Sequence, residues 1–372
     1  MLKPKKPIRE SRLFYFLGSI MKKKNQHFVP QFYFRFFSAD GKSISLIKKK
    51  DGECKSVAPI RSQSSGSFFY GSVDVEDALS KLEGQLKSVL AKMKDCKNLK
   101  DFLPDERLLV FIAIVFQHER TLAARTKMQP AYNHLMRLFA EMEIGKDDSL
   151  SEEEKENLIS SLNLLEIDAV RPQLETMVHT MQNAHLLSDL LPVVLENKTN
   201  RPFFFGDAPV VLHNAYYGDV KHQGVLGYAS SGLQIIYPLS EKRTLMFVDN
   251  KTYKVKGVYK DHFVNVKNLK DIEVINRLQF LSASSTVYFS DPKYNSYAEY
   301  VWSLDKDKAS YSEVKIVEAM ACCDDGETKE IIHSFVPLLP IKFRLSFLEH
   351  EVLSDGNYVP SIRESCEIDD EI

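Results

Sequence analysis

Two polar residues directly follow the longest apolar run of the chain, and their types could do chemistry. The run from Leu108 to Phe116 is apolar on every side of a predicted helix, and Gln117 and Arg120 come just after it. Three residues apart, they lie about 60° apart around the helix axis, so both can point into one cavity. A buried arginine keeps its charge and needs a carboxylate, a carbonyl oxygen or an anionic ligand beside it. Both a structural ion pair, with Gln117 as a hydrogen-bonding neighbour, and an anion-binding arginine fit this pattern.

A carboxylate partner for Arg120 is expected on the preceding helix. Glu83 lies at the edge of the apolar stripe of that helix, about 20° beyond Leu90 around the axis, and Glu76 lies about 20° further round. We therefore expect an Arg120–Glu83 contact. It is either purely structural, or it holds Arg120 ready for a phosphate or carboxylate group.

Two further residues are candidates for proton transfer. His27 lies among aromatic residues just before Val29 and Pro30, and histidine titrates in the range that suits a general acid or base. A histidine in such surroundings is also often a core residue bonded to a backbone carbonyl. Asp207 lies between two predicted strands and before Ala208-Pro209, where it either stabilises an Asx-type turn or acts as a catalytic carboxylate.

Motifs of several large enzyme classes are absent from the sequence. It contains no G-x-x-x-x-G-K-[ST] phosphate loop, no G-x-G-x-x-G, no H-E-x-x-H and no G-x-S-x-G, which sets aside the chemistry of those classes. Cys322 and Cys323 are adjacent, but no histidine is spaced to activate them, so we interpret them as structural. The histidines at 179, 185, 213 and 222 lack the spacing of metal ligands.

The elements that must position these residues follow from the hydrophobic pattern. Short strands are predicted at 44–48 and 67–70. A period of 3.6 residues then predicts several helices: one from an N-cap at Asp74 to about 93, one from Pro104 past Arg125, one over 131–142 after a bend or break before Pro130, one from Ser151 to about 165, and one from Pro172 to about 197.

The character changes to β after Arg201. Branched and aromatic segments bounded by turn formers predict strands at 202–207, 210–213, 233–239, 244–249 and 286–290, with helices near 269–283 and 312–321. The order predicts an α+β fold: short N-terminal strands, a central helical bundle, and a β-rich C-terminal half packed on it. We expect residues 25–200 and 201–348 to form one continuous fold, between a basic extension at 1–24 and an acidic tail at 349–372.

Composition and charge limit the classes of protein. The chain of 372 residues is 44% hydrophobic and carries a net charge of −2, so neither disorder nor a bulk attraction to nucleic acid or membranes is indicated. The longest apolar run is too short to span a membrane. Five irregularly spaced cysteines predict reduced thiols and a cytoplasmic location. The apolar stretch at 13–17 has no small-residue cleavage site after it, and Met21 is an alternative start.

Several segments together resemble a bacterial family known as domain of unknown function 4238. Residues 27–37 match its H-x-[VI]-P-x-x-Y-L-x-x-F pattern with Phe34 in place of Leu, and residues 117–121 match Q-x-x-R-T. Residues 205–210 match [TS]-S-D-x-P-V, with Gly206 in place of Ser. The resemblance covers roughly residues 25–290 and implies a fold and a site, but no established activity. A role in defence or toxin biology is compatible with such a family.

These residues together predict an enzyme acting on a phosphate-containing substrate. His27, Glu83, Gln117, Arg120 and Asp207 are expected to converge on one pocket between the helices and the β region. His27 or Asp207 would be the general base, Arg120 would bind the phosphate, Gln117 would orient water or substrate, and Glu83 would hold Arg120. Nuclease-like hydrolysis or transfer is the sharpest form, and the carboxylates could hold Mg²⁺ although no metal motif supports it. The alternatives are a non-catalytic sensor or binding protein for a nucleotide or anionic ligand, and a buried structural network in an interaction scaffold.

Overall fold

The structure is a computed structural model of the chain. It describes residues 25–71, 73–162, 168–218, 224–259, 262–308, 314–322, 328–350 and 361–366. The predicted basic extension and most of the predicted acidic tail lie outside these residues. The fold is mixed α+β, as the sequence predicts, with short N-terminal strands, then helices, then a β-rich region that contains further helices. None of the helices in the described part is long and apolar enough to cross a membrane.

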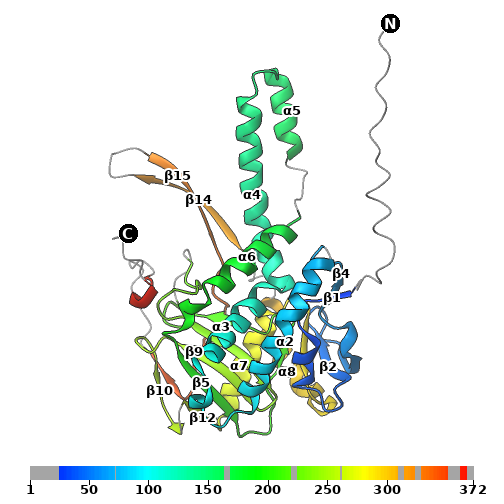
Figure 1. The fold of residues 1–372 in the computed structure, drawn as a ribbon, viewed down its shortest axis with the longest axis vertical. Coiled ribbons are helices and arrows are strands. Elements are labelled where there is room, and N and C mark those ends of the chain that lie inside the picture. The colour runs from blue at the N-terminus through cyan, green and yellow to red at the C-terminus, as the bar shows by residue number, and fades with distance from the viewer. Residues whose placement is uncertain are drawn as a thin grey trace.

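A six-stranded sheet forms the centre of the fold (Figure 1). Its order is β11 (Val258–Tyr259), β12 (Phe263–Val266), β5 (Leu191–Asn197), β9 (Arg243–Val248), β8 (Gln234–Ser240) and β7 (Val211–His213). β12 and β5 run parallel, and the other neighbours are antiparallel. Because the central strands are buried on both faces, they are apolar at consecutive positions rather than at alternate ones.

Helices cover both faces of this sheet. α2 (Val73–Asp95) and α3 (Pro104–Glu119) pack on the face that includes Val194, Leu245 and Phe247. The intervening residues of the same strands point to the opposite face, where α7 (Leu269–Ser282) packs on them. The alternation follows from the two-residue period of a strand and creates two separate cores. α6 (Val170–Gln182) packs against α3.

A second sheet brings distant parts of the chain together. Its order is β3 (Cys54–Pro59), β2 (Ser43–Lys48), β13 (Thr286–Phe289) and β6 (Phe205–Gly206), and every pair is antiparallel. α8 (Asn295–Asp305) packs against α7 and this sheet. The short helix α1 (Gln31–Arg35) inserts Tyr33 and Phe34 between the sheets, where the ring of Tyr33 stacks on Tyr237 with centroids 5.2 Å apart. The aromatic segment after Pro30 is thus part of the main core.

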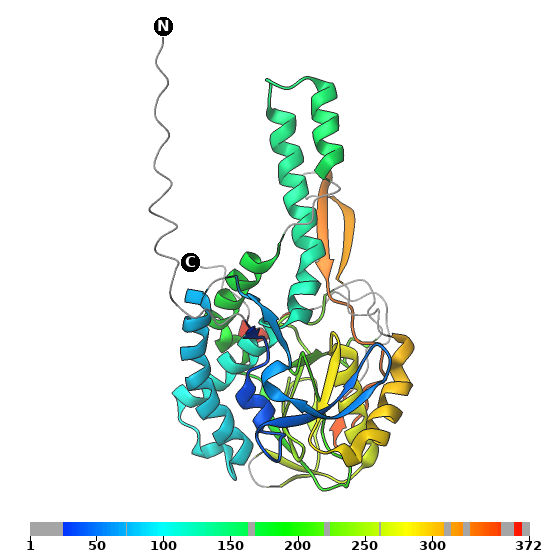
Figure 2. The same ribbon diagram turned by 90° about the vertical axis from the view of Figure 1, so that its right-hand side faces the viewer.

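Two hairpins project from the same end of the body (Figures 1 and 2). One consists of α4 (Leu122–Lys146) and α5 (Glu152–Leu162), and the other of β14 (Lys315–Cys322) and β15 (Thr328–Phe335). Two small antiparallel pairs complete the described elements: β1 (Asn25–His27) with β4 (Ser65–Ser67), and β10 (Lys254–Val255) with β16 (Leu348–Glu349).

The structure corrects two predicted helices that are strands. Residues 191–197 form β5 instead of extending the helix from Pro172, because this apolar segment is sandwiched between β12 and β9. Residues 315–322 form β14, which pairs along its length with β15. Both segments are short enough that their apolar pattern fits either element, so only their long-range partners decide. α8 was not predicted.

Several predicted boundaries are also wrong. α3 ends at Glu119 and α4 starts at Leu122, whereas the sequence predicts the interruption near Pro130. α4 continues through Pro130, which is exposed, so water can reach the backbone groups that proline leaves unpaired. The strand predicted at 67–70 is only β4, because Phe68 has a positive φ that turns the chain. α2 begins at Val73, so Asp74 is inside the helix rather than its cap.

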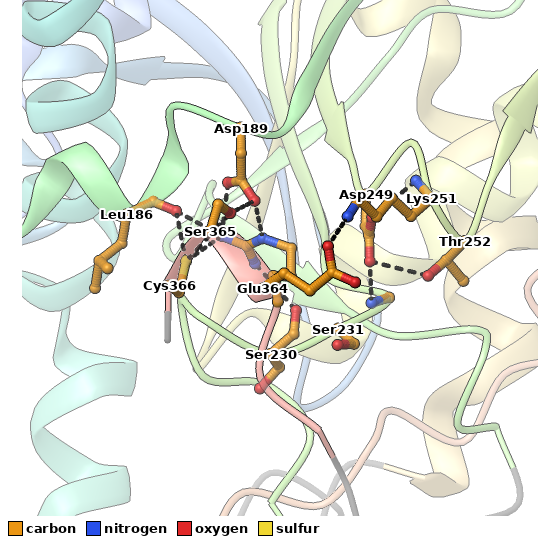
Figure 3. Close-up of polar contacts among 12 residues, drawn as sticks. Leu186, Asp189, Ser230, Ser231, Asp249, Lys251, Thr252, Glu364, Ser365 and Cys366 are labelled. Carbon is orange, nitrogen blue, oxygen red and sulfur yellow. Dashed lines mark hydrogen bonds and ion pairs between the residues drawn. The ribbon is translucent and has the colours of Figure 1, made fainter. Parts of the chain in front are cut away.

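A buried arginine, Arg363, anchors the last described segment to the body at Asp189, and Figure 3 shows Asp189 beside Ser365 and Cys366 of that segment. Both carboxylate oxygens of Asp189 accept hydrogen bonds from Arg363, through Nε at 2.7 Å and Nη2 at 3.0 Å. Arg363 also donates to the carbonyls of Ser230 and Leu186. This two-point geometry is the strongest form of an ion pair, and it ties the 186–189 turn to the 361–366 segment.

We expect Arg363→Met to cost about 2–3 kcal/mol of unfolding free energy, because it leaves a partly buried carboxylate at Asp189 without its partner. Urea denaturation followed by circular dichroism measures this change. Lys251→Met is the matched control, since the Lys251–Glu364 ion pair next to it is exposed to water and should matter little. Equal losses in the two variants would contradict the role of Arg363 as an anchor.

Candidate functional site

Residues 117–121 lie where α3 passes into α4, and this junction sorts their side chains into two groups. Arg120 is the C-cap of α3, and Thr121 has an extended backbone and caps α4 by accepting a hydrogen bond from the Ala124 N–H at 3.1 Å. Gln117 and Arg120 are fully buried, while His118 and Glu119 are partly exposed. The sequence prediction considered the first pair and passed over the second.

Arg120 lies at the centre of a buried cluster, and the predicted contact with Glu83 is confirmed. Its Nη2 is 2.7 Å from Oε1 of Glu83 and donates to the His27 carbonyl at 2.6 Å, while Nε donates to the Tyr70 hydroxyl at 3.0 Å. Burial opposes its charge, but Tyr70 and Glu83 outweigh this effect and raise the pKa of Arg120. Only Nη1 has no hydrogen-bond partner in the described structure. The guanidinium therefore acts chiefly on the protein's own groups.

Gln117 and His27 join the same cluster through the backbone. The amide Nε2 of Gln117 donates to the carbonyl of Phe28 at 3.1 Å, so it fixes the segment that also receives Arg120. The His27 ring lies between Gln63 and Gln31: its Nδ1 donates to the Gln63 carbonyl at 3.0 Å, and its Nε2 is 3.1 Å from the Gln31 amide nitrogen. Burial lowers the pKa of His27, so the ring is neutral near pH 7. Both ring nitrogens already have protein partners.

Asp207 has a different set of partners from the other four predicted residues. Its carboxylate accepts hydrogen bonds from the backbone N–H groups of Ser284, Ser285 and Thr286 at 2.7, 2.9 and 3.2 Å, and from the Ser285 hydroxyl at 2.7 Å. Burial raises its pKa, and these hydrogen bonds oppose that rise. Asp207 thus holds the turn between α7 and β13. Four of the five predicted residues come together around Arg120, whereas the hydrogen bonds of Asp207 in the described structure go to this turn.

The neighbouring Gly206 is required by close packing. A Cβ atom at this position would lie 2.9 Å from the backbone oxygen of Gln279 and 3.0 Å from the Cβ of Ala283. Both are parts of α7 or its end, so β6 can approach this helix only where a side chain is absent. The glycine that replaces the family's usual serine therefore brings Asp207 against the turn that it holds.

A cavity of about 540 Å³ lies on the other side of the α3–α4 junction, and we call it the α4 pocket. It is enclosed by the first turns of α4, by residues 208–212 and 224–230, and by Val314 and residues 335–339 at the two ends of the β14–β15 hairpin. Its apolar lining includes Ala124, Met128, Ala131, Val210, Leu212, Leu226 and Phe335. Its charged or titratable lining consists of His118, Glu119 and Lys127.

His118 and Glu119 form a hydrogen-bonded triangle with Tyr228. Oε1 of Glu119 is 2.9 Å from Nδ1 of His118 and accepts from the Tyr228 hydroxyl at 2.7 Å, and that hydroxyl is 2.8 Å from the same Nδ1. Burial would raise the pKa of Glu119, but the charge and hydrogen bond of His118 and the hydrogen bond of Tyr228 lower it overall. Burial and Glu119 together raise the pKa of Tyr228. A carboxylate therefore holds the Nδ1–H of His118, and Nε2 has no partner in the described part of the chain.

The residues of the α4 pocket give little support for a metal centre. Among the described residues, no group of three or more His, Cys, Asp or Glu side chains is arranged to hold a metal ion. The pocket combines one carboxylate, one imidazole and one ammonium with a mostly apolar wall. Such a lining suits an organic molecule with one polar end.

Sequence reasoning missed this pocket for a clear reason. His118 and Glu119 fall in the x-x of the Q-x-x-R-T pattern, where the only available signal was two polar residues at the end of an apolar helix. Nothing in the sequence distinguished Lys127, because charged residues occur at many positions of this helix. Tyr228 follows a loop more than 100 residues later, so only the folded chain shows that it contacts His118.

The family comparison agrees with the resemblance in the sequence. The family described as Protein of unknown function (DUF4238) matches residues 25–293, and the chain belongs to it. This match includes the Arg120 cluster, Asp207 and most of the α4 pocket, but not Val314 or residues 335–339. No curated protein and no solved structure matches the chain.

The buried position of Arg120 leads to a prediction that separates structure from ligand binding. Arg120→Met should cost about 3–5 kcal/mol of unfolding free energy, because it leaves Glu83 and the His27 carbonyl without their donor. His118→Ala should cost less than about 1 kcal/mol, because its side chain borders a cavity and water can replace it. Thermal and urea unfolding of both variants provide the measurement. An Arg120→Met protein with wild-type stability would instead favour an arginine reserved for a ligand.

The lowered pKa of His27 predicts a loss of stability in mild acid. The unfolded chain binds a proton at His27 near the ordinary pKa of about 6.5, whereas the folded chain binds it only at lower pH, so stability falls as pH decreases between these values. We expect His27→Gln, which can still donate to the Gln63 carbonyl, to lose less stability than the wild type between about pH 7 and pH 5. Urea titrations at both pH values test this. An unchanged difference would show that His27 does not contribute to the acid sensitivity.

Proposed function

We propose that this protein binds a small organic molecule with an apolar body in the α4 pocket. The observation that carries the proposal is the cavity itself, whose size falls within the range of small-molecule sites and whose wall is mostly apolar with a few polar groups. The Arg120 cluster lies next to the pocket and fixes the α3–α4 junction. It thereby fixes the direction in which the side chains of His118 and Glu119 point. Free thiols at Cys54, Cys96 and Cys366 support the predicted cytoplasmic location.

A hydrolase acting in the same pocket is the second candidate, and it rests on one observation. Glu119 holds the Nδ1–H of His118, which leaves Nε2 available to accept a proton from a water molecule. The nuclease form of this activity has less support. Lys127 is the only lysine or arginine that lines the described α4 pocket, whereas nucleic-acid sites use several cations along a groove.

Filling the pocket should abolish binding of an apolar molecule. We expect Ala131→Trp to weaken binding of the neutral fluorophore N-phenyl-1-naphthylamine at least tenfold, because the indole would occupy the cavity. Leu135→Trp is the matched control, since this residue lies one turn further along α4 and is exposed. Fluorescence titration of the folded variants measures the affinity, and equal affinity in wild type and Ala131→Trp would overturn the proposed function.

The variant His118→Ala distinguishes a binding protein from a hydrolase. In a binding protein this variant keeps its affinity for the fluorophore, and wild type shows no turnover of p-nitrophenyl esters or phosphates, or of labelled DNA and RNA with Mg²⁺. In a hydrolase, wild type turns over one of these substrates and the variant binds but does not.

A further inference from the structure

Lys127 is the cationic group of the α4 pocket. It lies on α4, lines the cavity, and makes no hydrogen bond or ion pair with any described residue. Glu119 is close enough to interact with its charge, but Oε1 of this carboxylate is already engaged by His118 and Tyr228. Burial lowers the pKa of Lys127, and the charge of Glu119 opposes this shift. Glu119 interacts with this cation without a hydrogen bond or close ion pair, so an anion that enters the cavity can add a direct ion pair with the ammonium.

The direction of α4 adds to this positive potential. Thr121, Ala123 and Ala124 form the N-terminus of a 25-residue helix and also line the pocket. The first turn of α4 has no acidic residue to offset the positive end of the helix dipole. The dipole and Lys127 therefore favour a negative charge from the same helix, whereas the ionised carboxylate of Glu119 opposes it.

The remaining wall selects for an apolar body. Met128 and Ala131 lie within one turn of Lys127 on α4, and Val210, Leu212, Leu226 and Phe335 contribute the rest of the apolar lining. A compact inorganic anion would leave this surface in contact with water, whereas an alkyl or aryl group would bury it. Burial of apolar surface contributes roughly 25 cal/mol per Å² before the costs of binding.

We propose that the ligand of the α4 pocket is an anionic amphiphile, with a carboxylate head on Lys127 and its alkyl or aryl body against the apolar wall. This inference rests on the proposed function, and it names the chemical class that the pocket binds. Lys127 is then the residue that determines specificity, and the hydrocarbon wall supplies most of the affinity.

The test compares ligands that differ only in the head group. Decanoate, decanol and decylamine compete with N-phenyl-1-naphthylamine for wild-type protein, Lys127→Met and the control Lys146→Met, whose lysine is exposed at the far end of α4. We expect decanoate to bind wild type and the control at least tenfold more tightly than decanol, and decylamine to bind more weakly than both. Lys127→Met should bind decanoate and decanol equally, and Lys127→Arg should recover part of the preference.

The outcomes distinguish the inference from the proposed function. If decanol competes as well as decanoate in wild type, or if Lys127→Met keeps the preference, the anionic class is wrong while the binding pocket stands. If the fluorophore binds wild type but none of the three decyl compounds displaces it, the inference also fails and the proposed function remains. If the fluorophore does not bind wild type, both fail. Thermal unfolding of each variant confirms that the comparison is made between folded proteins.

Discussion

The charge of Arg120 must be satisfied inside the protein, and this requirement organises the region around the pocket. A guanidinium that is 1% exposed cannot lose its proton, so its donors need fixed acceptors. They find one on α2, in Glu83, one in the backbone at His27, and one in the turn before α2, at Tyr70. The segment at His27, and α2 with the turn before it, are thereby tied to the point where α3 ends.

This constraint explains why the four residues 117–120 have two different roles. The helix must stop at Glu119 for Arg120 to reach its acceptors, and Thr121 then starts α4 in a new direction. Residues three apart share one side of a helix, so Gln117 and Arg120 face the core, while His118 and Glu119 between them face the pocket. The buried cluster therefore holds the α3–α4 junction, and the groups that line the pocket lie beside it. The residues that make a sequence pattern specific for a family can therefore all be structural.

The sequence predicted the parts of this arrangement that depend on local geometry. Glu83 and Arg120 could be paired because both lie on regular helices whose apolar faces must meet, and angles around a helix axis are fixed by its period. Asp207 could not be placed in the same way, because its partners at 284–286 belong to a turn that only β13 brings close. The assignment of residues 191–197 to a helix failed for the same reason, since the neighbours β9 and β12 come from later in the chain. The α4 pocket was beyond prediction because its wall combines segments that lie far apart in the chain.

The α4 pocket contains one negative and one positive side chain, and the protein holds the two with different firmness. Glu119 is immobilised by two donors, and the lowered pKa of its carboxyl means that it stays ionised without a ligand. Lys127 has a flexible stem and no such donors or acceptors among the described residues, so its ammonium can move toward whatever enters. In the proposed binding mode the ammonium of Lys127 contacts the ligand, and His118 and Tyr228 contribute by holding Oε1 of Glu119.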